Sequence, residues 1–326
     1  KYFLFDLNCS CFLNIFSKKY MKKIAIIIFV LLCSCNKEKL KETPKETRKE
    51  IPETALYFTQ IKSNDVKLGK PVYGDWLSSH KEKGQTFEQY FFSKHIIPTK
   101  KENIIYIRPI GNFNSLQKKQ IELLNEYLAI FFQLKTKTLK SISNDVVPNS
   151  ARRMMFGHEQ LLAGYLLDDV LKKENPANRI ALMGLSELDL YPKPEWNYVF
   201  GLASYREKVG VSSIYRLQDG ELTSENFNLC LSRLLKISSH EIGHMFGLHH
   251  CINADCVMNG SNSMSETDKH SIRLCSVCQQ KLSSCIKYDD RKRLTDLENY
   301  FKRNNLTPEF LAMKKDTEAV STKKNI

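Results

Sequence analysis

The chain has 326 residues, of which 42% are hydrophobic and 26% are charged. This length and composition allow one large core or two modest ones, which excludes a protein that is disordered throughout. The net charge is +13 at pH 7, but Lys and Arg are dispersed among Asp and Glu. A solvated basic surface is therefore favoured over a nucleic-acid-binding face, and no nucleic-acid partner is expected.

Residues 21–34 have the layout of a secretion signal. Two lysines follow Met21, and a nine-residue apolar run extends from Ile24 to Leu32. At about 1.5 Å per residue, this run covers roughly half of a ~30 Å hydrocarbon core, which argues against a spanning helix. The ending Leu-Cys-Ser-Cys resembles a bacterial lipobox, and this resemblance implies cleavage before Cys35 and a lipid on its side chain. A plain signal peptide and a fortuitous apolar start are the alternatives.

The segments on either side of this signal are expected to lie outside the folded domain. Residues 1–20 lack an initiating Met and are interpreted as a mis-called leader, with a genuine extension as the alternative. Residues 35–55 repeat Lys, Glu, Thr and Pro, so they bury too little apolar surface to offset their ordering entropy and should form a flexible tether. The expected location is the bacterial cell envelope, lipid-anchored to a membrane, with the domain outside the cytoplasm. The alternative is a cytoplasmic protein whose apparent signal is an artefact.

The folded domain is expected over residues 56–290 and begins with alternating strands and helices. Residues 103–110 are apolar and β-branched, which predicts a strand, and apolar residues recur at helical spacing over 115–134. A second helix is predicted over 159–173, followed by a buried strand over 179–188.

Two further β-like runs, 199–204 and 209–217, are predicted to form a hairpin through residues 205–208. Strands interleaved with helices predict an α/β domain with a mixed, twisted sheet.

The sequence HEIGHMFGLHHC begins at His240, directly after an apolar run with helical spacing. Thr223 or Ser224 is expected to cap this helix. His240 and His244 are four residues apart, so a helix places both imidazoles on one face, at a spacing suited to two corners of a zinc tetrahedron. Glu241 is the candidate general base, because in H-E-x-x-H enzymes this carboxylate acts on water activated by the zinc.

A glycine follows the second histidine at the position where the helix is expected to end. Gly247 can adopt a left-handed conformation and return the chain, so that His250 supplies a third ligand. Three protein ligands leave one position of the zinc open, which is typical of a catalytic site. His249 is interpreted as lying beside the site or facing solvent. H-E-x-x-H alone also arises by chance on surface helices, but the extended pattern is far more specific.

The residues after the third histidine complete a pattern that resembles the archaemetzincins, a branch of the metzincin zinc peptidases. The pattern consists of four cysteines and one methionine: Cys251, Cys256, Met258, Cys275 and Cys278. The likeness reaches back over residues 181–217. It departs from the family between Met258 and Cys275, where 16 residues stand and a slightly longer loop is expected.

This resemblance implies a metzincin-like α+β fold and a role for each matching residue. His240, His244 and His250 would bind a catalytic zinc, with Glu241 acting on water, and Met258 would be the Met-turn residue beneath the metal.

The same resemblance implies a second zinc on the four cysteines, which gives two Zn²⁺ ions per chain. Four thiolates at about 2.3 Å form a closed shell, so this zinc should be structural and give a zinc-stapled C-terminal subdomain. Disulfides among these cysteines are the alternative in an exported protein. Cys230 and Cys285 fall outside the pattern and are interpreted as a buried small side chain and a spare thiol, or else as a disulfide.

Residues 291–326 are expected to form a charged C-terminal helix and tail. Apolar residues at helical spacing give this helix a docking face, and the last ten or so residues are expected to be disordered. The docking face consists of Leu294, Leu297, Tyr300 and Phe301.

The sequence therefore favours a monomeric zinc metallopeptidase that hydrolyses peptide bonds of a peptide or protein substrate. The alternative is a catalytically silent zinc-binding lipoprotein that uses a metzincin fold for binding or scaffolding. The intact Glu241 favours the peptidase, because a protein without turnover has no chemical need for that base.

Overall fold

The computed structural model of the chain describes residues 56–218 and 220–321. The expected leader at 1–20, the signal at 21–34 and the tether with Cys35 lie outside these residues. Among the helices of the described part, none has the length and apolar character needed to span a bilayer.

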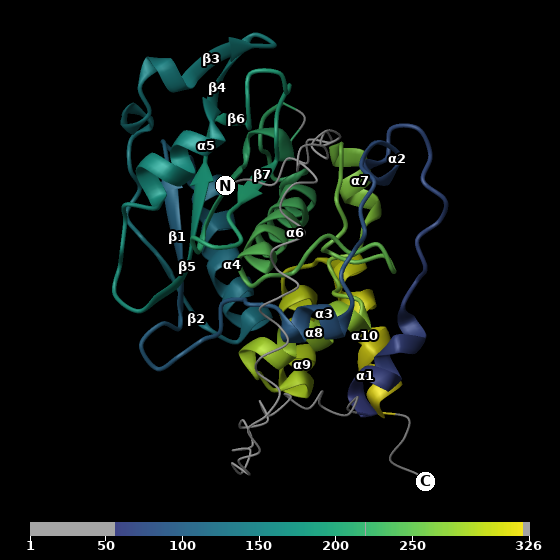
Figure 1. Ribbon diagram of the computed structural model, residues 1–326. Coiled ribbons are helices and arrows are strands. Elements are labelled where there is room, and N and C mark those ends of the chain that lie inside the picture. Colours follow the sequence, from purple (N-terminus) through teal and green to yellow (C-terminus); the bar gives the residue numbers. More distant parts are fainter. Residues whose placement is uncertain (1–55, 219, 322–326) are drawn as a thin grey trace, which may run out of the picture. The chain divides into compact units, whose positions relative to one another are not determined.

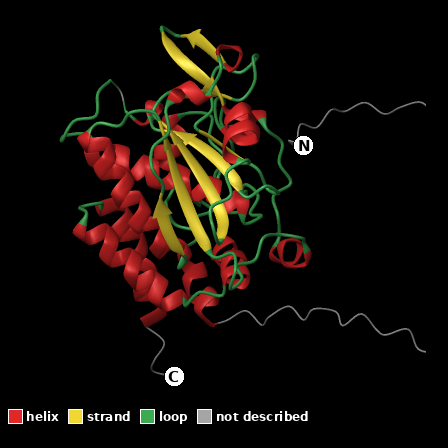
Figure 2. Ribbon diagram, turned by 90° about the vertical axis from the view of Figure 1, so that its left-hand side faces the viewer, coloured by secondary structure: helices red, strands yellow, loops and turns green. Residues whose placement is uncertain are grey.

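A five-stranded sheet forms the centre of the described domain (Figure 2). Its strand order is β2-β1-β5-β8-β7. Strands β2, β1, β5 and β8 are parallel, and the edge strand β7 runs antiparallel to β8 through the predicted hairpin. These findings confirm the predicted α/β class with a mixed sheet. The strands are β1 (Ile104–Ile110), β2 (Lys135–Thr138), β5 (Arg179–Ser186), β7 (Gly201–Ala203) and β8 (Val209–Ser213).

Helices cover this sheet and extend beyond it. Helix α4 corresponds to the helix predicted over 115–134. It begins after Asn114, whose side chain accepts a hydrogen bond from the Gln117 amide and forms a capping box. The helices are α1 (Leu56–Ile61), α2 (Trp76–Ser79), α3 (Phe87–Phe92), α4 (Ser115–Phe132), α5 (Ala163–Tyr165), α6 (Phe227–Met245), α7 (Met264–Lys269), α8 (Ser276–Ile286), α9 (Asp290–Arg303) and α10 (Thr307–Ser321).

Both faces of the sheet are buried because side chains alternate along each strand. Ile105 and Ile107 of β1 belong to the main core, together with buried residues of α4 and α6. Ile104 and Tyr106 belong to a second apolar cluster on the opposite face, with the π-helical turn Leu166–Leu171. Figure 1 shows α6 beside α4, with α8 and α9 below them in this view.

The prediction of one helix over 159–173 is wrong. Residues His158–Leu162 form β4, which pairs with β3 (Arg152–Met155) and β6 (Asp189–Tyr191) in a separate three-stranded sheet. Helical structure begins only at Ala163. The backbone of β4 finds partners on both sides, and this pairing overrides the helical spacing of the apolar residues.

The C-terminal helix docks on the domain as predicted. Leu294, Leu297, Tyr300 and Phe301 are all buried, and the Tyr300 hydroxyl donates to the Leu123 carbonyl of α4 over 2.9 Å. The expected disorder of the last ten residues is wrong for their described part, because α10 extends to Ser321 and buries Val320.

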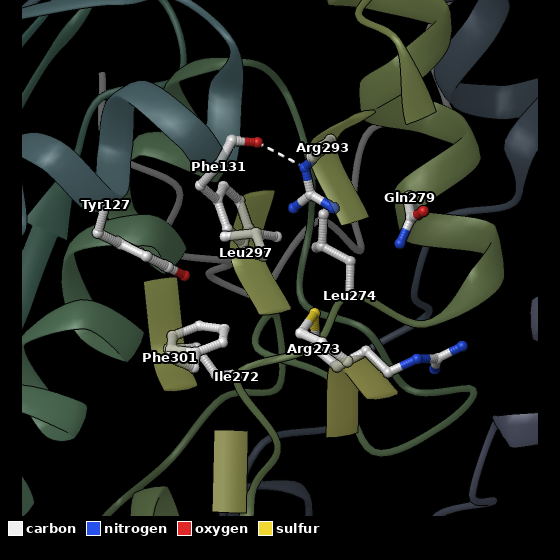
Figure 3. Close-up of a pocket in the computed structure, with 10 residues that line it drawn as sticks. Tyr127, Phe131, Ile272, Arg273, Leu274, Gln279, Arg293, Leu297 and Phe301 are labelled. Atoms are coloured by element: carbon white, nitrogen blue, oxygen red, sulfur yellow. Dashed lines mark hydrogen bonds between the residues drawn. The ribbon is translucent and has the colours of Figure 1, made fainter. Parts of the chain in front are cut away.

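A small pocket lies among these packed helices and does not involve the histidine motif (Figure 3). Arg293 closes part of it by donating through Nε to the Phe131 carbonyl over 2.6 Å. The same guanidinium lies 4.3 Å from the centre of the Phe131 ring. None of the residues lining this pocket carries the chemistry predicted from the sequence, so it belongs to the packing of α4, α8, α9 and α10 with residues 272–274.

Candidate metal centres

Helix α6 carries the first two histidines on its last two turns. Its N-cap is Asn226, so the predicted caps Thr223 and Ser224 are wrong. The Asn226 side chain instead accepts a hydrogen bond from the Thr223 amide over 2.8 Å, which folds residues 223–226 into a turn before the helix.

The helix ends in a Schellman motif that returns the chain toward the histidines. Gly247 has the predicted positive φ, 86°. Its amide donates to the His244 carbonyl over 2.9 Å, and the Leu248 amide donates to the Gly243 carbonyl over 3.1 Å. His250 follows this turn.

The structure brings His240, His244 and His250 together. Ligand atoms of the three side chains lie within 4.8 Å of one another, and Nε2 of His240 is 2.9 Å from Nε2 of His244. Two nitrogens that bind one zinc at 2.0–2.1 Å with tetrahedral angles lie about 3.3 Å apart, close to this separation. The three imidazoles therefore fit one zinc ion.

The other ring nitrogen of each histidine already has a hydrogen-bond partner. Such bonds fix the orientation of each ring and leave Nε2 for a metal. The partners of Nδ1 are the Val257 carbonyl for His240 at 2.8 Å, the Leu248 carbonyl for His244 at 2.6 Å and the Glu82 carboxylate for His250 at 2.7 Å.

The electrostatics of the site favour the neutral imidazoles that bind metals. Burial, with the neighbouring His250, lowers the pKa of His240 to about 3. Burial also lowers the pKa of His244 well below its ordinary value. Burial raises the pKa of Glu241 to about 8. The Glu241 carboxyl group lies against Gly201 of β7, where an added Cβ would be 2.5 Å from Oε1.

Met258 is buried beneath the helix segment that carries the histidines. An added Cβ at Gly243, between His240 and His244 in sequence, would be 2.6 Å from the Met258 sulfur. The glycine of HEIGH therefore allows the thioether to approach the helix backbone.

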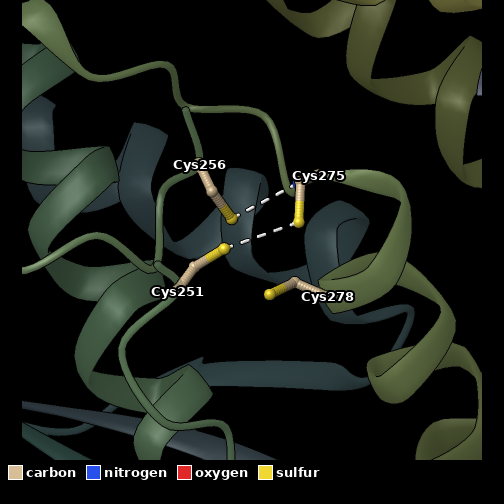
Figure 4. Close-up of side chains that lie close together, drawn as sticks. All are labelled: Cys251, Cys256, Cys275 and Cys278. Carbon is tan, nitrogen blue, oxygen red and sulfur yellow. Dashed lines mark hydrogen bonds between the residues drawn. The ribbon is translucent and has the colours of Figure 1, made fainter. Parts of the chain in front are cut away.

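The four cysteines of the pattern form a second cluster (Figure 4). All four sulfur atoms are buried and lie within 4.8 Å of one another. The Cys251 and Cys275 sulfur atoms are 3.6 Å apart. Sulfur atoms bound to one zinc at about 2.3 Å lie about 3.8 Å apart, whereas a disulfide requires about 2.05 Å, so the cluster fits zinc. Neighbouring thiols donate to Cys251 and lower the pKa of its thiol.

Cys230 and Cys285 form no disulfide in the structure, and both are buried, as expected for Cys230. Cys230 donates to the Leu217 carbonyl and Cys285 to the Ile96 carbonyl. This separation leaves no role for a disulfide between them in the structure.

Several residues near the histidines were not found from the sequence. Glu82 and Trp76 lie in segments without a motif, and Glu82 is 168 positions before His250. Tyr205 lies within the family-like segment 181–217, but nothing in that segment singled it out. The Tyr205 hydroxyl is 3.2 Å from Nδ1 of His244. His249 is exposed, as predicted, with its ring 5.5 Å from that of Tyr205. Spacing could not have identified these residues, because folding alone brings them to the site.

Comparison with known proteins assigns the family. Residues 118–284 match the family described as peptidase family M54. The chain is 34% identical over 247 residues to archaemetzincin-2 of Rattus norvegicus, covering 66% of this chain and 68% of that protein.

This chain belongs to the archaemetzincins. It is 39% identical over 124 residues to the archaemetzincin of Thermococcus kodakarensis, covering 38% of this chain and 66% of that protein. It also resembles the crystal structure of an archaemetzincin from Methanopyrus kandleri, with 28% identity and a TM-score of 0.49 over 59% of this chain and 100% of that one.

Membership of the archaemetzincins confirms the resemblance seen in the sequence and makes the chain a zinc metallopeptidase with a metzincin-like fold. The matched residues 118–284 contain both metal clusters. Glu82 and Trp76 lie before them.

Proposed function

We propose that this archaemetzincin hydrolyses peptide bonds at the site formed by His240, His244 and His250, with Glu241 as the general base. The convergence of three imidazoles beside the buried carboxyl group of Glu241 carries this proposal. Each imidazole has Nδ1 engaged and Nε2 available, which fits a zinc ion with an open position for substrate.

A zinc ion in this site supplies Lewis-acid chemistry, since it lowers the pKa of water to about 7 and polarises a carbonyl group. Glu241 takes the proton of the attacking water and passes it to the leaving amine. The neighbouring strand β7 is an edge strand of the sheet. An extended peptide can pair with its free backbone groups, which would present the scissile bond to Glu241.

We propose a second zinc ion on Cys251, Cys256, Cys275 and Cys278. A closed shell of four sulfur ligands leaves no position for substrate, so this ion is structural. It would join the loop after α6 to the N-terminus of α8, which begins directly after Cys275.

The substitution Glu241→Gln tests the catalytic proposal. The side chain keeps its shape but loses the base, so both zinc ions should remain and turnover should fall by about 10²- to 10⁴-fold. Zinc content and cleavage of a broad peptide library are measured on the same samples of residues 36–326. Retained turnover in the variant contradicts the proposed role of Glu241. Two zinc ions with no cleavage by the wild-type chain favour the catalytically silent zinc-binding protein instead.

We also propose that the domain acts as a monomer on peptide or protein substrates, outside the cytoplasm, and is attached to a membrane of the bacterial envelope by a lipid on Cys35. The signal-like layout of residues 21–35 supports this location. Palmitate labelling of the full chain should disappear in Cys35→Ala. A wild-type chain that takes up no palmitate and is found in the cytosolic fraction would contradict the lipid anchor.

A further inference from the structure

The turn that carries His250 is held by a segment far ahead of it in the sequence. We name residues 76–95 the clasp. Gln85 of the clasp spans the turn, because its Nε2 donates to the Gly247 carbonyl over 3.1 Å and its Oε1 accepts from the His249 amide over 3.4 Å. The clasp therefore satisfies backbone groups of the turn that the end of α6 leaves free.

Two more clasp residues fix the same turn by close packing. The Tyr90 hydroxyl donates to the Phe246 carbonyl over 2.9 Å, and the Tyr90 side chain is fully buried. A Cβ added at Gly84 would lie 2.6 Å from Cγ1 of Ile252. Contacts on both sides of His250 thus come from the clasp.

One clasp residue contacts the third histidine itself. Oε1 of Glu82 is 2.7 Å from Nδ1 of His250 and also accepts from Nε1 of Trp76 over 3.0 Å. A carboxylate at this distance holds the proton of the ring on Nδ1 and directs the lone pair of Nε2 toward His240 and His244.

The three histidines differ in the origin of these partners. Val257 and Leu248, which hold His240 and His244, lie within the residues that match the family, whereas Glu82 lies outside them. The other carboxylate oxygen of Glu82 is buried and has no hydrogen-bond partner among the described residues. An unpaired buried oxygen costs free energy, and the orientation of a metal ligand explains why a charged group stands beside His250.

We propose that Glu82 is a positioning residue for the zinc ligand His250, and that the clasp is a working part of the catalytic zinc centre. This inference rests on the proposed function only in assigning a zinc ion to the three histidines. Glu82 contacts Nδ1 of His250 and acts through the orientation and basicity of that imidazole.

Glu82→Ala and Glu82→Gln in the full chain test this proposal. The alanine variant removes the acceptor, so zinc affinity at the histidines should fall by about 10- to 100-fold, while the zinc ion at the four cysteines remains. The glutamine variant keeps an acceptor oxygen without the charge, so its affinity should lie between those of the alanine variant and the wild type. The measurement is a competition titration with a chelator, followed by zinc content per chain.

Glu266→Gln is the matched control. Glu266 accepts from the backbone amide of Trp76 over 2.8 Å and so holds the clasp without contacting a histidine of the site. This variant should change zinc affinity by less than about twofold, below the range seen when a partner of a metal ligand is removed.

Two results would overturn the proposal: wild-type zinc affinity in Glu82→Ala, or an equal loss of affinity in Glu266→Gln. Retention of one zinc ion and of the circular dichroism spectrum shows that a variant is folded. Because affinity is read without substrate, a wild-type chain that binds zinc but cleaves nothing would contradict the proposed function and leave this inference standing.

Discussion

The two metal clusters adjoin in sequence, at His250 and Cys251, but they are built differently. All four cysteines are buried, and their sulfur atoms would fill the tetrahedral shell of one zinc ion. The histidine cluster has two partly exposed members and offers three ligands. One of its ligands also depends on a carboxylate from outside the family-matched residues. The comparison teaches that one loop can carry both a closed set of ligands, suited to a structural ion, and an open set, suited to a catalytic ion.

The largest effect is expected from Cys251→Ser, which breaks the closed centre. Structural zinc sites contribute about 10–16 kcal/mol of binding free energy that is coupled to folding, so the variant should lose several kcal/mol of stability. Zinc content should fall from two toward one, and thermal unfolding should occur at a lower temperature. Unchanged zinc content and unfolding temperature would show that these cysteines hold no metal.

Graded removal of metal should separate the two centres in the wild-type chain. A chelator of moderate strength should remove zinc from the open histidine site first, with loss of peptide cleavage and little change in circular dichroism. Added zinc should restore cleavage. A stronger chelator should then take the second ion and unfold the C-terminal part, because four buried thiolates bind more tightly. Simultaneous loss of both ions and of helical signal would contradict the predicted difference.

Gly243→Ala tests the packing beneath the open centre. The added methyl group would lie 2.6 Å from the Met258 sulfur and must displace it. Overpacking of this kind costs about 1–3 kcal/mol, which denaturant unfolding can measure. Gly164→Ala is a suitable comparison, since no atom lies within 4 Å of a Cβ added there. Equal stability of the two variants would show that the core around Met258 yields without cost.

The smallest effect is expected from Asp290→Asn, which lies outside both centres. This variant shows how much of the pH dependence of stability comes from a group other than the metal ligands. Burial raises the pKa of Asp290 from 3.8 to about 6. The folded chain therefore binds more protons than the unfolded chain between these values, and stability falls as pH rises through 6. The free energy of unfolding of the variant, relative to that of the wild type, should therefore be higher above pH 6 than at pH 4. The difference should be roughly 1 kcal/mol or less, since the side chain is partly solvated. A difference from wild type that is constant with pH would contradict this assignment.

Spacing in the sequence was sufficient to predict those residues of the site that lie together in one short segment. His240 and His244 share a helix face, and Gly247 must end that helix for His250 to return, so short-range geometry determines their placement. The cysteines extend over a longer loop, and they were recognised through a family pattern rather than through spacing.

Features that depend on contacts between distant segments could not be predicted from the sequence. Residues 159–162 have helical spacing but become a strand because β3 and β6 supply partners from other segments. Glu82 has no periodic or motif context, and its role depends on the fold that places it beside His250. In both cases the deciding contact lies outside any window along the chain.

The direct succession of His250 and Cys251 has a consequence for how the enzyme matures. Ordering the loop around the thiolates restricts the backbone that presents the third imidazole, so the second ion would enter a site whose entropy cost has already been met. We therefore expect newly made chains under zinc scarcity to fill the thiolate cluster first. Chains with zinc at the cysteines alone would be folded but inactive, and binding of one more zinc ion at the histidines would activate them.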